Sequence, residues 1–276
     1  MLLEKFGVVL ILAASVLPAD AQDQQPRRHA GWPCVATVDR SYARNSEATG
    51  GKVFLFRKTE LAGVAEDMSA SSAHEETVFR ASGQLTEGTY KFDIPIDSTI
   101  ESAYFFVSLQ CLGTLEIVSP SGETLNPDQG DIEYHRYAAV HMAIVRQPVP
   151  GIWRARVTGR GVLSMVVSAK TDLRLGGVTL TDGGERVIFT AKRDTPLRLE
   201  ANITGLADQI AFQFISSSAA PIRSVDLTLE KETSADRTYA AEVIPPATEF
   251  RLAVTGIDPK GFRFQRVQKQ LVVTEQ

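Results

Sequence analysis

Short runs of alternating or β-branched residues, separated by turn residues, fill most of the chain from Thr77 to Val273. Alternate side chains of an extended strand point to opposite faces, so such runs are typical of strands that bury one face. Turn signals between the runs include SPSG at 119–122 and VPG at 149–151. The pattern therefore predicts an all-β protein built from β-sandwiches.

The runs fall into two sets that meet near Thr171. The first set predicts strands at 77–82, 88–94, 102–109, 115–119, 137–145, 151–158 and 162–169. The second predicts strands at 173–179, 186–191, 196–203, 210–216, 224–230, 238–243, 249–255 and 262–273. Roughly eight short strands in about a hundred residues is typical of an immunoglobulin-like sandwich. Because no low-complexity or Pro-rich linker separates the sets, we expect two tandem sandwiches that pack against each other.

The N-terminal end has the pattern of an export signal. Lys5 supplies a basic start, residues 6–17 are apolar or small, and small residues precede Gln22. We expect residues 1–21 to be a signal peptide cleaved after Ala21, with retention as an uncleaved membrane anchor as the alternative. The stretch is short for a hydrocarbon core of about 30 Å, and no second such run follows. The mature chain is therefore expected to be secreted, extracellular or periplasmic, without a membrane span.

A short strand-helix segment is predicted before the first sandwich. Gly50 and Gly51 make a turn that leads into the apolar run VFLF at 53–56. Thr59 then has the character of a helix N-cap, and apolar residues follow at helical spacing between Leu61 and Met68. This is the one helix expected after the signal. A lone strand and helix cannot form a core, so we expect the segment to dock on the neighbouring sandwich.

Charge and motif content narrow the classes of function. The chain has 29 basic and 33 acidic residues, a balance that gives no reason to expect a nucleic acid or an anionic membrane as partner. No Gly-x-Ser-x-Gly elbow is present, and no cysteine is placed as a nucleophile beside a histidine. We therefore expect no enzyme.

The chain has two cysteines, Cys34 and Cys111, and both follow the signal. In an oxidising compartment a disulfide between them is the natural expectation, and two separate buried thiols are the alternative. Such a bridge would fasten the N-terminal segment to the first sandwich. Closing a loop of this length stabilises by about 4 kcal/mol in the chain-entropy model.

Several segments resemble hemicentins, proteins that contain a von Willebrand factor A domain. ATGGKVF at 48–54 and the helix after it are similar to the last strand and helix of that A domain. FDIPIDST at 92–99, IVSPSG at 117–122 and PVPGIW at 148–153 resemble the galactose-binding-like sandwich that follows it. VTGID at 254–258 and GFRFQRV at 261–267 resemble the end of the next, Ig-like module.

This resemblance implies a domain order and a role. Residues 22–75 would hold a leader and a von Willebrand A-domain-like remnant, residues 76–171 a galactose-binding-like jelly roll, and residues 172–276 an Ig-like or fibronectin III-like sandwich. Hemicentin-like proteins act in cell adhesion or matrix, which implies a non-enzymatic binding or scaffold protein with an extracellular or periplasmic protein partner.

Acidic and amide side chains crowd one predicted loop of the first sandwich, at Asn126, Asp128, Asp131 and Glu133. Oxygen ligands of this kind suit Ca²⁺, so a structural calcium is one interpretation, and a solvated loop is the alternative. No other cofactor is expected. The sequence DMSAS at 67–71 matches the metal-binding pattern of A domains, but it closes a predicted helix and lacks the preceding strand, so a polar helix end is expected there.

Four aromatic residues are candidates for stacking on a sugar ring: Tyr104, Tyr134, Tyr137 and Trp153. The galactose-binding-like resemblance makes a carbohydrate-binding module the alternative function, with a glycan as partner. Exposed aromatics on one face would favour it, and burial of all four would exclude it. Trp153 begins a strand whose alternate residues are apolar, so packing in the sandwich core is the simpler expectation for that residue.

Overall fold

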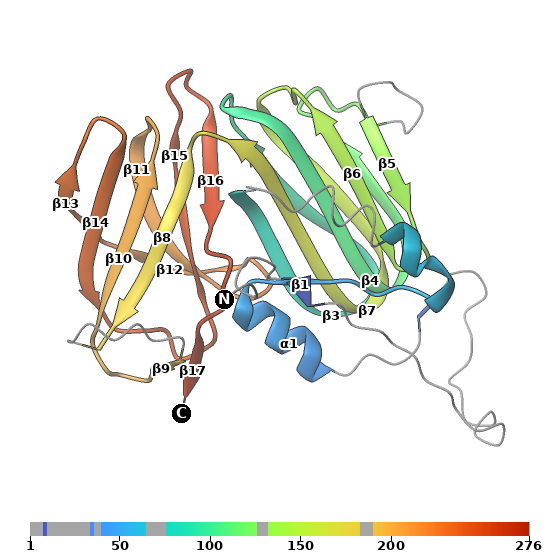
Figure 1. Cartoon of the computed structure of the whole chain (residues 1–276), viewed down its shortest axis with the longest axis horizontal. Coiled ribbons are helices and arrows are strands. Elements are labelled where there is room, and N and C mark those ends of the chain that lie inside the picture. Colours follow the sequence, from blue (N-terminus) through green and yellow to red (C-terminus); the bar gives the residue numbers. More distant parts are fainter. Residues whose placement is uncertain are drawn as a thin grey trace.

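The computed structural model describes residues 8–9, 34–35, 40–64, 76–125, 132–182 and 190–275. Within these ranges the chain forms two β-sandwiches side by side, and an N-terminal segment crosses their junction (Figure 1). This confirms the all-β sandwich class. No helix in the described ranges is both long and apolar enough to cross a membrane.

The first sandwich is a single antiparallel sheet of five strands in the order β3-β7-β4-β6-β5. The strands are β3 (Glu76–Ile96), β4 (Ile100–Val118), β5 (Ile132–Arg136), β6 (Val140–Arg146) and β7 (Gly151–Thr171). The sequence pattern predicted two separate strands in each of β3, β4 and β7, which is wrong. The interruptions in the pattern are bends within continuous strands of 19 to 21 residues.

Ring contacts show that this sheet folds over on itself. Phe105 pairs with Val167 across the ladder, yet its ring lies 5.9 Å from Trp153, near the start of the same β7 strand. On a straight strand Trp153 and Val167 would be roughly 45 Å apart. Phe79 and Phe92, both on β3, likewise have ring centroids 5.7 Å apart. The two halves of the sheet are therefore the two layers of the sandwich, and the core lies between them.

Glycines and β-bulges make the bend. The ladder register shifts between Leu85 and Gly88 on β3 and between Leu109 and Cys111 on β4. Bulges add a residue on one strand and bend it. Gly159 of β7 lies at the same level, and a Cβ there would be 2.3 Å from the carbonyl oxygen of Cys111. The backbones can approach this closely only because residue 159 has no side chain.

The second sandwich has two four-stranded sheets, β13-β14-β10-β8 and β12-β11-β15-β16, and a short parallel pair of β17 and β9. The strands are β8 (Arg174–Thr181), β9 (Thr190–Lys192), β10 (Leu197–Thr204), β11 (Asp208–Ile215), β12 (Pro221–Val225), β13 (Thr228–Glu232), β14 (Asp236–Val243), β15 (Arg251–Ile257), β16 (Arg263–Val267) and β17 (Val273–Glu275). Phe214 and Phe250 meet edge to face in its core, 4.6 Å between ring centroids. Its architecture is Ig-like, as predicted.

The N-terminal segment contains β1 (Val8–Val9), α1 (Arg40–Thr49), β2 (Lys52–Val53) and the 3-10 helix η1 (Lys58–Glu60). The sequence did not predict α1, because RSYARNSEAT lacks an apolar stripe. The expected strand is reduced to β2, which pairs in parallel with β1.

The expected helix starts differently from the prediction. The helical region begins with η1 and continues through residues 61–64, and Arg57 rather than Thr59 precedes it. The backbone N–H of Arg57 donates to Glu60 Oε2 at 2.8 Å, so Glu60 fastens the first turn. The remainder of the predicted helix lies outside the described residues.

Docking of this segment on the first sandwich is as expected. Three of its apolar side chains are buried against the outer face of the first sandwich: Phe54, Phe56 and Val64. There they pack with Phe106 and Met142. The rings of Phe54 and Phe106 are 4.5 Å apart. The N-terminal segment thus covers a face of the sheet that would otherwise expose apolar side chains to water.

Candidate functional site

The two sandwiches meet through edge strands. β3 is at the edge of the first sheet and β16 at the edge of its sheet in the second sandwich, and these two strands pack against each other. The side-chain amide of Gln265 on β16 donates to the backbone oxygen of Val78 on β3 at 3.0 Å. Each sandwich therefore covers an edge of the other that could pair with a foreign strand.

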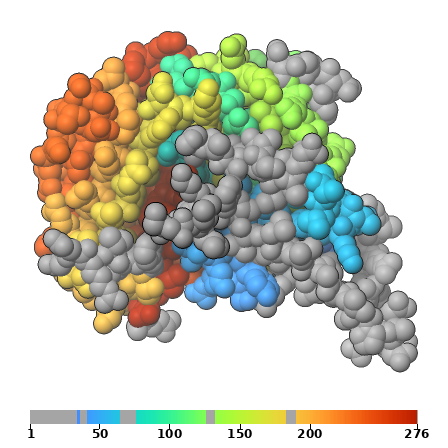
Figure 2. Space-filling view, viewed as in Figure 1, coloured from blue at the N-terminus to red at the C-terminus, as the bar shows by residue number. Residues whose placement is uncertain are grey.

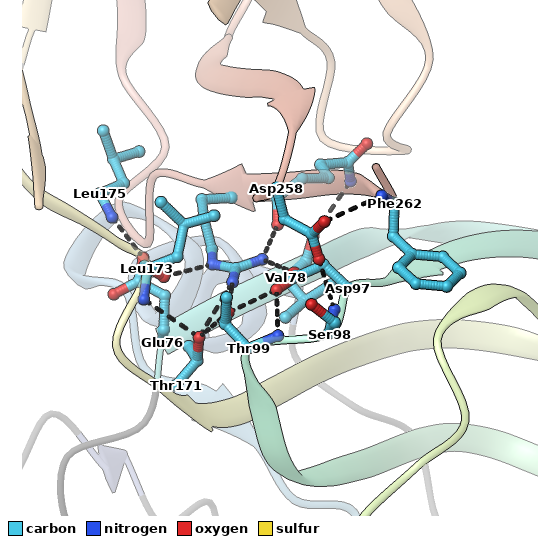
Figure 3. A network of polar contacts seen from close by, with 12 residues as sticks. Glu76, Val78, Asp97, Ser98, Thr99, Thr171, Leu173, Leu175, Asp258 and Phe262 are labelled. Carbon is cyan, nitrogen blue, oxygen red and sulfur yellow. Dashed lines mark hydrogen bonds and ion pairs between the residues drawn. The ribbon is translucent and has the colours of Figure 1, made fainter. Parts of the chain in front are cut away.

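Arg266 of β16 is fully buried at the junction. Figure 3 labels residues that bond it, among them Asp97, Thr171 and Leu173. Nη1 of Arg266 lies 2.7 Å from Asp97 Oδ2, and both side chains are fully buried. Nε donates to the Leu173 oxygen at 2.7 Å, and Nη2 donates to the Thr171 hydroxyl at 3.2 Å. The remaining bonds of the guanidinium run to the Gln265 oxygen and the Thr99 hydroxyl. A guanidinium has five N–H groups, and this site provides an acceptor for each.

The acceptors come from three parts of the chain. Asp97 and Thr99 lie in the turn between β3 and β4, Thr171 ends β7, and Leu173 lies in the connection to the second sandwich. The Thr99 hydroxyl also bonds the Thr171 hydroxyl at 2.6 Å, which fastens the β3–β4 turn to the end of β7. Arg266 of the second sandwich therefore binds three separate segments at the closed end of the first one.

A second contact at the same end joins two turns. Asp258, which follows β15, accepts the backbone N–H of Ser98 at 2.7 Å. It also accepts the backbone N–H groups of Lys260 and Phe262 within its own turn. Burial alone would raise the pKa of Asp258, but the hydrogen bonds, that from Ser98 foremost, outweigh it and lower the pKa below its ordinary value.

Helix α1 makes a separate ionic clamp at the other end of the junction. Glu47 of α1 forms a two-point ion pair with Arg80 on β3, with N–O distances of 2.9 and 3.0 Å. The same carboxylate pairs with Arg251 on β15 of the second sandwich, and all three side chains are buried. The backbone oxygen of Glu47 accepts the N–H of Leu271 at 2.9 Å. The space-filling view shows α1 lying against the C-terminal strands (Figure 2).

The electrostatics of this clamp favour its charged form. Burial alone would raise the pKa of Glu47, but the guanidinium groups of Arg80 and Arg251 outweigh it and hold the pKa below its ordinary value. Burial lowers the pKa of Arg251 to about 10, with Glu47 opposing the shift. Nη1 of Arg251 is buried without a hydrogen-bond partner in the described chain. One carboxylate thus compensates two buried guanidinium groups.

A cleft of about 410 Å³ lies on the junction beside these contacts, with both sandwiches contributing to its wall. Glu76 of β3 lies in it, and its Oε1 accepts the N–H of Leu175 at 3.2 Å. Burial raises the pKa of Glu76 above its ordinary value, although Arg266 partly opposes the shift. Arg174 and Lys269 also line the cleft.

The structure joins the two cysteines. Cys34 and Cys111 form a disulfide across 77 residues of sequence, and the N–H of Val35 donates to the oxygen of Gln110 at 3.0 Å. The predicted disulfide is confirmed, and it fastens the N-terminal segment to the first sandwich at the bend of β4.

The four candidate sugar-stacking aromatics do not form one platform. Trp153 is 3% exposed, and its Nε1 donates to the Val149 oxygen at 2.8 Å, so it is a core residue. Tyr134 packs at the rim of the same core, with its hydroxyl 3.3 Å from Nδ1 of the buried His141. Tyr137 packs instead against the apolar cluster of the N-terminal segment.

Tyr104 also points away from the core of the first sandwich. Its neighbours Ala103 and Phe105 belong to that core, so Tyr104 lies on the opposite face of β4. Three of the four aromatics are partly exposed, but they do not share one face.

The candidate calcium ligands Asn126, Asp128 and Asp131 lie outside the described residues, as does DMSAS at 67–71. Glu133 is described and lies on β5, where it contacts His135 Nε2 at 2.9 Å and Arg146 at 3.2 Å. The described ranges contain no group of three or more His, Cys, Asp or Glu placed to hold a metal ion.

The charged residues of the junction were not predicted from the sequence. Their signal was an arginine inside an otherwise apolar strand run, as in VFRA at 78–81, FRLAV at 250–254 and FQRV at 264–267. A charge at such a position must find a buried partner, and here the partners are Glu47 and Asp97.

Comparison with known proteins gives no family. No protein-family model matches the chain, and no curated protein matches it. Among solved structures, the Bacillus licheniformis lipase BlEst2 in its propeptide form aligns at 11% identity over 72% of this chain and 41% of its own, with a TM-score of 0.36. The titin Ig tandem domains A164-A165 align at 11% identity over 73% of this chain and 97% of theirs, with a TM-score of 0.18. The chain thus spans less than half of the lipase chain, and these distant likenesses support no functional inference.

Proposed function

We propose that this chain is an exported, non-enzymatic binding or scaffold protein that acts through protein-protein contacts. The observation that carries the proposal is the ionic junction, in which buried arginines fix the second sandwich on the first. The resemblance of its segments to hemicentins and the disulfide Cys34–Cys111 support an adhesion-type role outside the cytoplasm.

The chemistry of the junction favours a role that depends on orientation. Burying charges has a high desolvation cost, and well-packed apolar residues often stabilise an interface as well or better. A guanidinium that needs every acceptor in place instead permits few relative orientations of the two sandwiches. Arg266 and Glu47 therefore support a protein that must hold surfaces from both sandwiches in a fixed arrangement.

One end of the molecule supplies such a combined surface. The hydrogen bond from Ser98 to Asp258 places the β3–β4 turn beside the β15–β16 turn. The β6–β7 connection is close, because Ile96, next to the first of these turns, pairs with Gly151. Two large apolar side chains are exposed in these connections: Val149 at 65% and Phe262 at 36%.

The test is capture of a protein partner by the purified chain from the extracellular or envelope fraction of its source, beside a glycan array with and without Ca²⁺. We expect a saturable protein partner that is lost with Val149→Asp and Phe262→Asp and retained with Leu206→Asp, a similarly exposed apolar residue of the second sandwich. Glycan binding without a protein partner would replace the proposal with the carbohydrate-binding alternative. The scattered placement of the four aromatics gives that alternative less support.

A further inference from the structure

Among the described strands, β5 lies at the end of the first sheet and pairs with β6 alone. None of its five residues is buried, and Glu133 and Arg136 are exposed. We propose that β5 is a self-complementary edge at which two copies of this chain pair antiparallel, joining their first sheets into one continuous sheet.

The hydrogen-bond phase of β5 follows from its hairpin with β6. The N–H of Tyr137 donates to the oxygen of Val140 at 2.8 Å and closes the hairpin. In an antiparallel ladder hydrogen-bonded pairs alternate with non-bonded pairs, so the residues bonded to β6 are His135 and Glu133. Ile132, Tyr134 and Arg136 therefore point their N–H and C=O groups outward.

This phase limits how a second copy can pair. Two copies can form backbone hydrogen bonds only where outward-pointing residues of one β5 lie opposite outward-pointing residues of the other. Because these residues alternate along the strand, the two-fold axis that relates the copies must pass through a residue of β5 and not between two residues. With the axis at Tyr134, this residue pairs with its own copy, and Ile132 pairs with Arg136 of the second copy. All three outward residues then find backbone partners on the other strand.

The charges select this register. With the axis at Tyr134, Glu133 lies opposite His135 of the second copy, twice by symmetry, in non-bonded pairs where side chains are closest. An axis at Glu133 would put two carboxylates opposite each other, and opposite like charges destabilise a sheet pair. An axis at His135 would pair two histidines and would no longer place Glu133 opposite His135.

Three other edge strands, β13, β3 and β16, suit a second copy less well. β13, TLEKE at 228–232, has the same length and is fully exposed, but the register centred on its middle residue places Glu230 opposite itself. β3 and β16 cover each other at the junction. The charge pattern thus distinguishes β5 from β13, and the junction leaves β3 and β16 covered.

The test measures the mass of the purified, oxidised chain by sedimentation equilibrium over a wide concentration range. We expect the weight-average mass to rise about twofold towards that of a two-fold dimer. Glu133→Lys and His135→Glu should each remain monomeric. An equimolar mixture of these two variants should dimerise again. In the mixed pair the introduced lysine of one chain faces the introduced glutamate of the other, and the unchanged His135 faces the unchanged Glu133.

The matched control is Glu232→Lys on β13, which breaks a comparable surface contact to Arg237 and should dimerise like wild type. The restored mixture shows that the single variants still fold. A monomeric wild-type chain at every concentration would overturn the proposal. So would a dimer that survives either single variant, or a mixture of the two variants that stays monomeric. Because the readout is mass alone, these outcomes do not depend on the partner-binding function proposed above.

Discussion

The replacement Arg266→Met tests whether the ionic junction holds the two sandwiches together. Methionine fills a similar volume but removes every donor to Asp97, Thr99, Thr171 and Leu173. Among the described residues, the fully buried Asp97 carboxylate would keep only the N–H and hydroxyl of Thr99 as donors. The substitution therefore leaves a buried charge without its counter-ion.

The magnitude follows from this burial. Removing one member of a buried ion pair costs about 3–5 kcal/mol, since the other charge remains desolvated. Arg154 and Asp93 are the matched control, because their N–O distance is also 2.7 Å while their side chains are 43% and 59% exposed. An exposed pair contributes less than about 1 kcal/mol, so Arg154→Met should change stability little. Combining Arg266→Met with Asp97→Asn should cost less than the sum of the single changes.

The assay is equilibrium unfolding in urea, followed by tryptophan fluorescence and by far-UV circular dichroism. In a Trp32→Phe background Trp153 is the one tryptophan and reports the core of the first sandwich, whereas circular dichroism reports both sandwiches. In this background we expect the two signals to change together, and with Arg266→Met the curves should separate as the second sandwich unfolds at lower urea. Equal small losses for Arg266→Met and Arg154→Met, with coincident curves, would refute the role assigned to the junction.

Three further predictions concern a buried histidine, a glycine at the bend and the disulfide. Burial, with the charge of Arg136 adding to it, lowers the pKa of His141 from 6.5 to about 4, so folding favours the neutral ring. The free energy of unfolding therefore has its full value above pH 6.5 and falls by about 3 kcal/mol as the pH drops towards 4. His141→Gln should flatten that part of the stability-pH curve, and parallel curves would contradict the assignment. Gly159→Ala should cost about 3 kcal/mol in urea unfolding, because its Cβ would meet backbone, whereas Gly177→Ala, with nothing within 4 Å, should be tolerated. Replacing Cys34 and Cys111 by serine should lower stability by about 4 kcal/mol and expose the N-terminal segment to protease, and an unchanged digestion pattern would show that packing alone holds it.

The alternation of apolar residues was enough to predict the sandwich class, the Ig-like second module and the position of most strands. It was not enough to predict that β3, β4 and β7 each run through both layers of the first sandwich. A glycine at which the alternation of apolar and polar residues changes phase looks the same in sequence in two cases. The chain can turn back there into a new strand, or one strand can continue through a bulge. The contact between Gly159 and the Cys111 backbone, which decides between these, is made by residues far apart in sequence.

The candidate site was harder to predict for a related reason. Aromatic and acidic residues suggest ligands by their chemistry, and they directed attention to Trp153 and Glu133. Trp153 is a core residue, and Glu133 is bound by its own chain. Helix α1 has no apolar stripe, so periodicity could not reveal it, although its Glu47 bridges the two sandwiches.

The junction both covers the edge strands β3 and β16 and fixes the orientation of one sandwich relative to the other. If β3 and β16 only shielded each other's edges, apolar side chains between them would suffice and would allow the sandwiches to slide. Arg266 and Arg251 add acceptors at fixed positions near opposite ends of the contact, one at the turn holding Asp97 and one at α1 through Glu47. Two separated anchors fix rotation as well as translation of one body against another. The edge strand β5 then keeps a defined position relative to the second sandwich, so any assembly built on that edge would present the loops around Phe262 in one orientation.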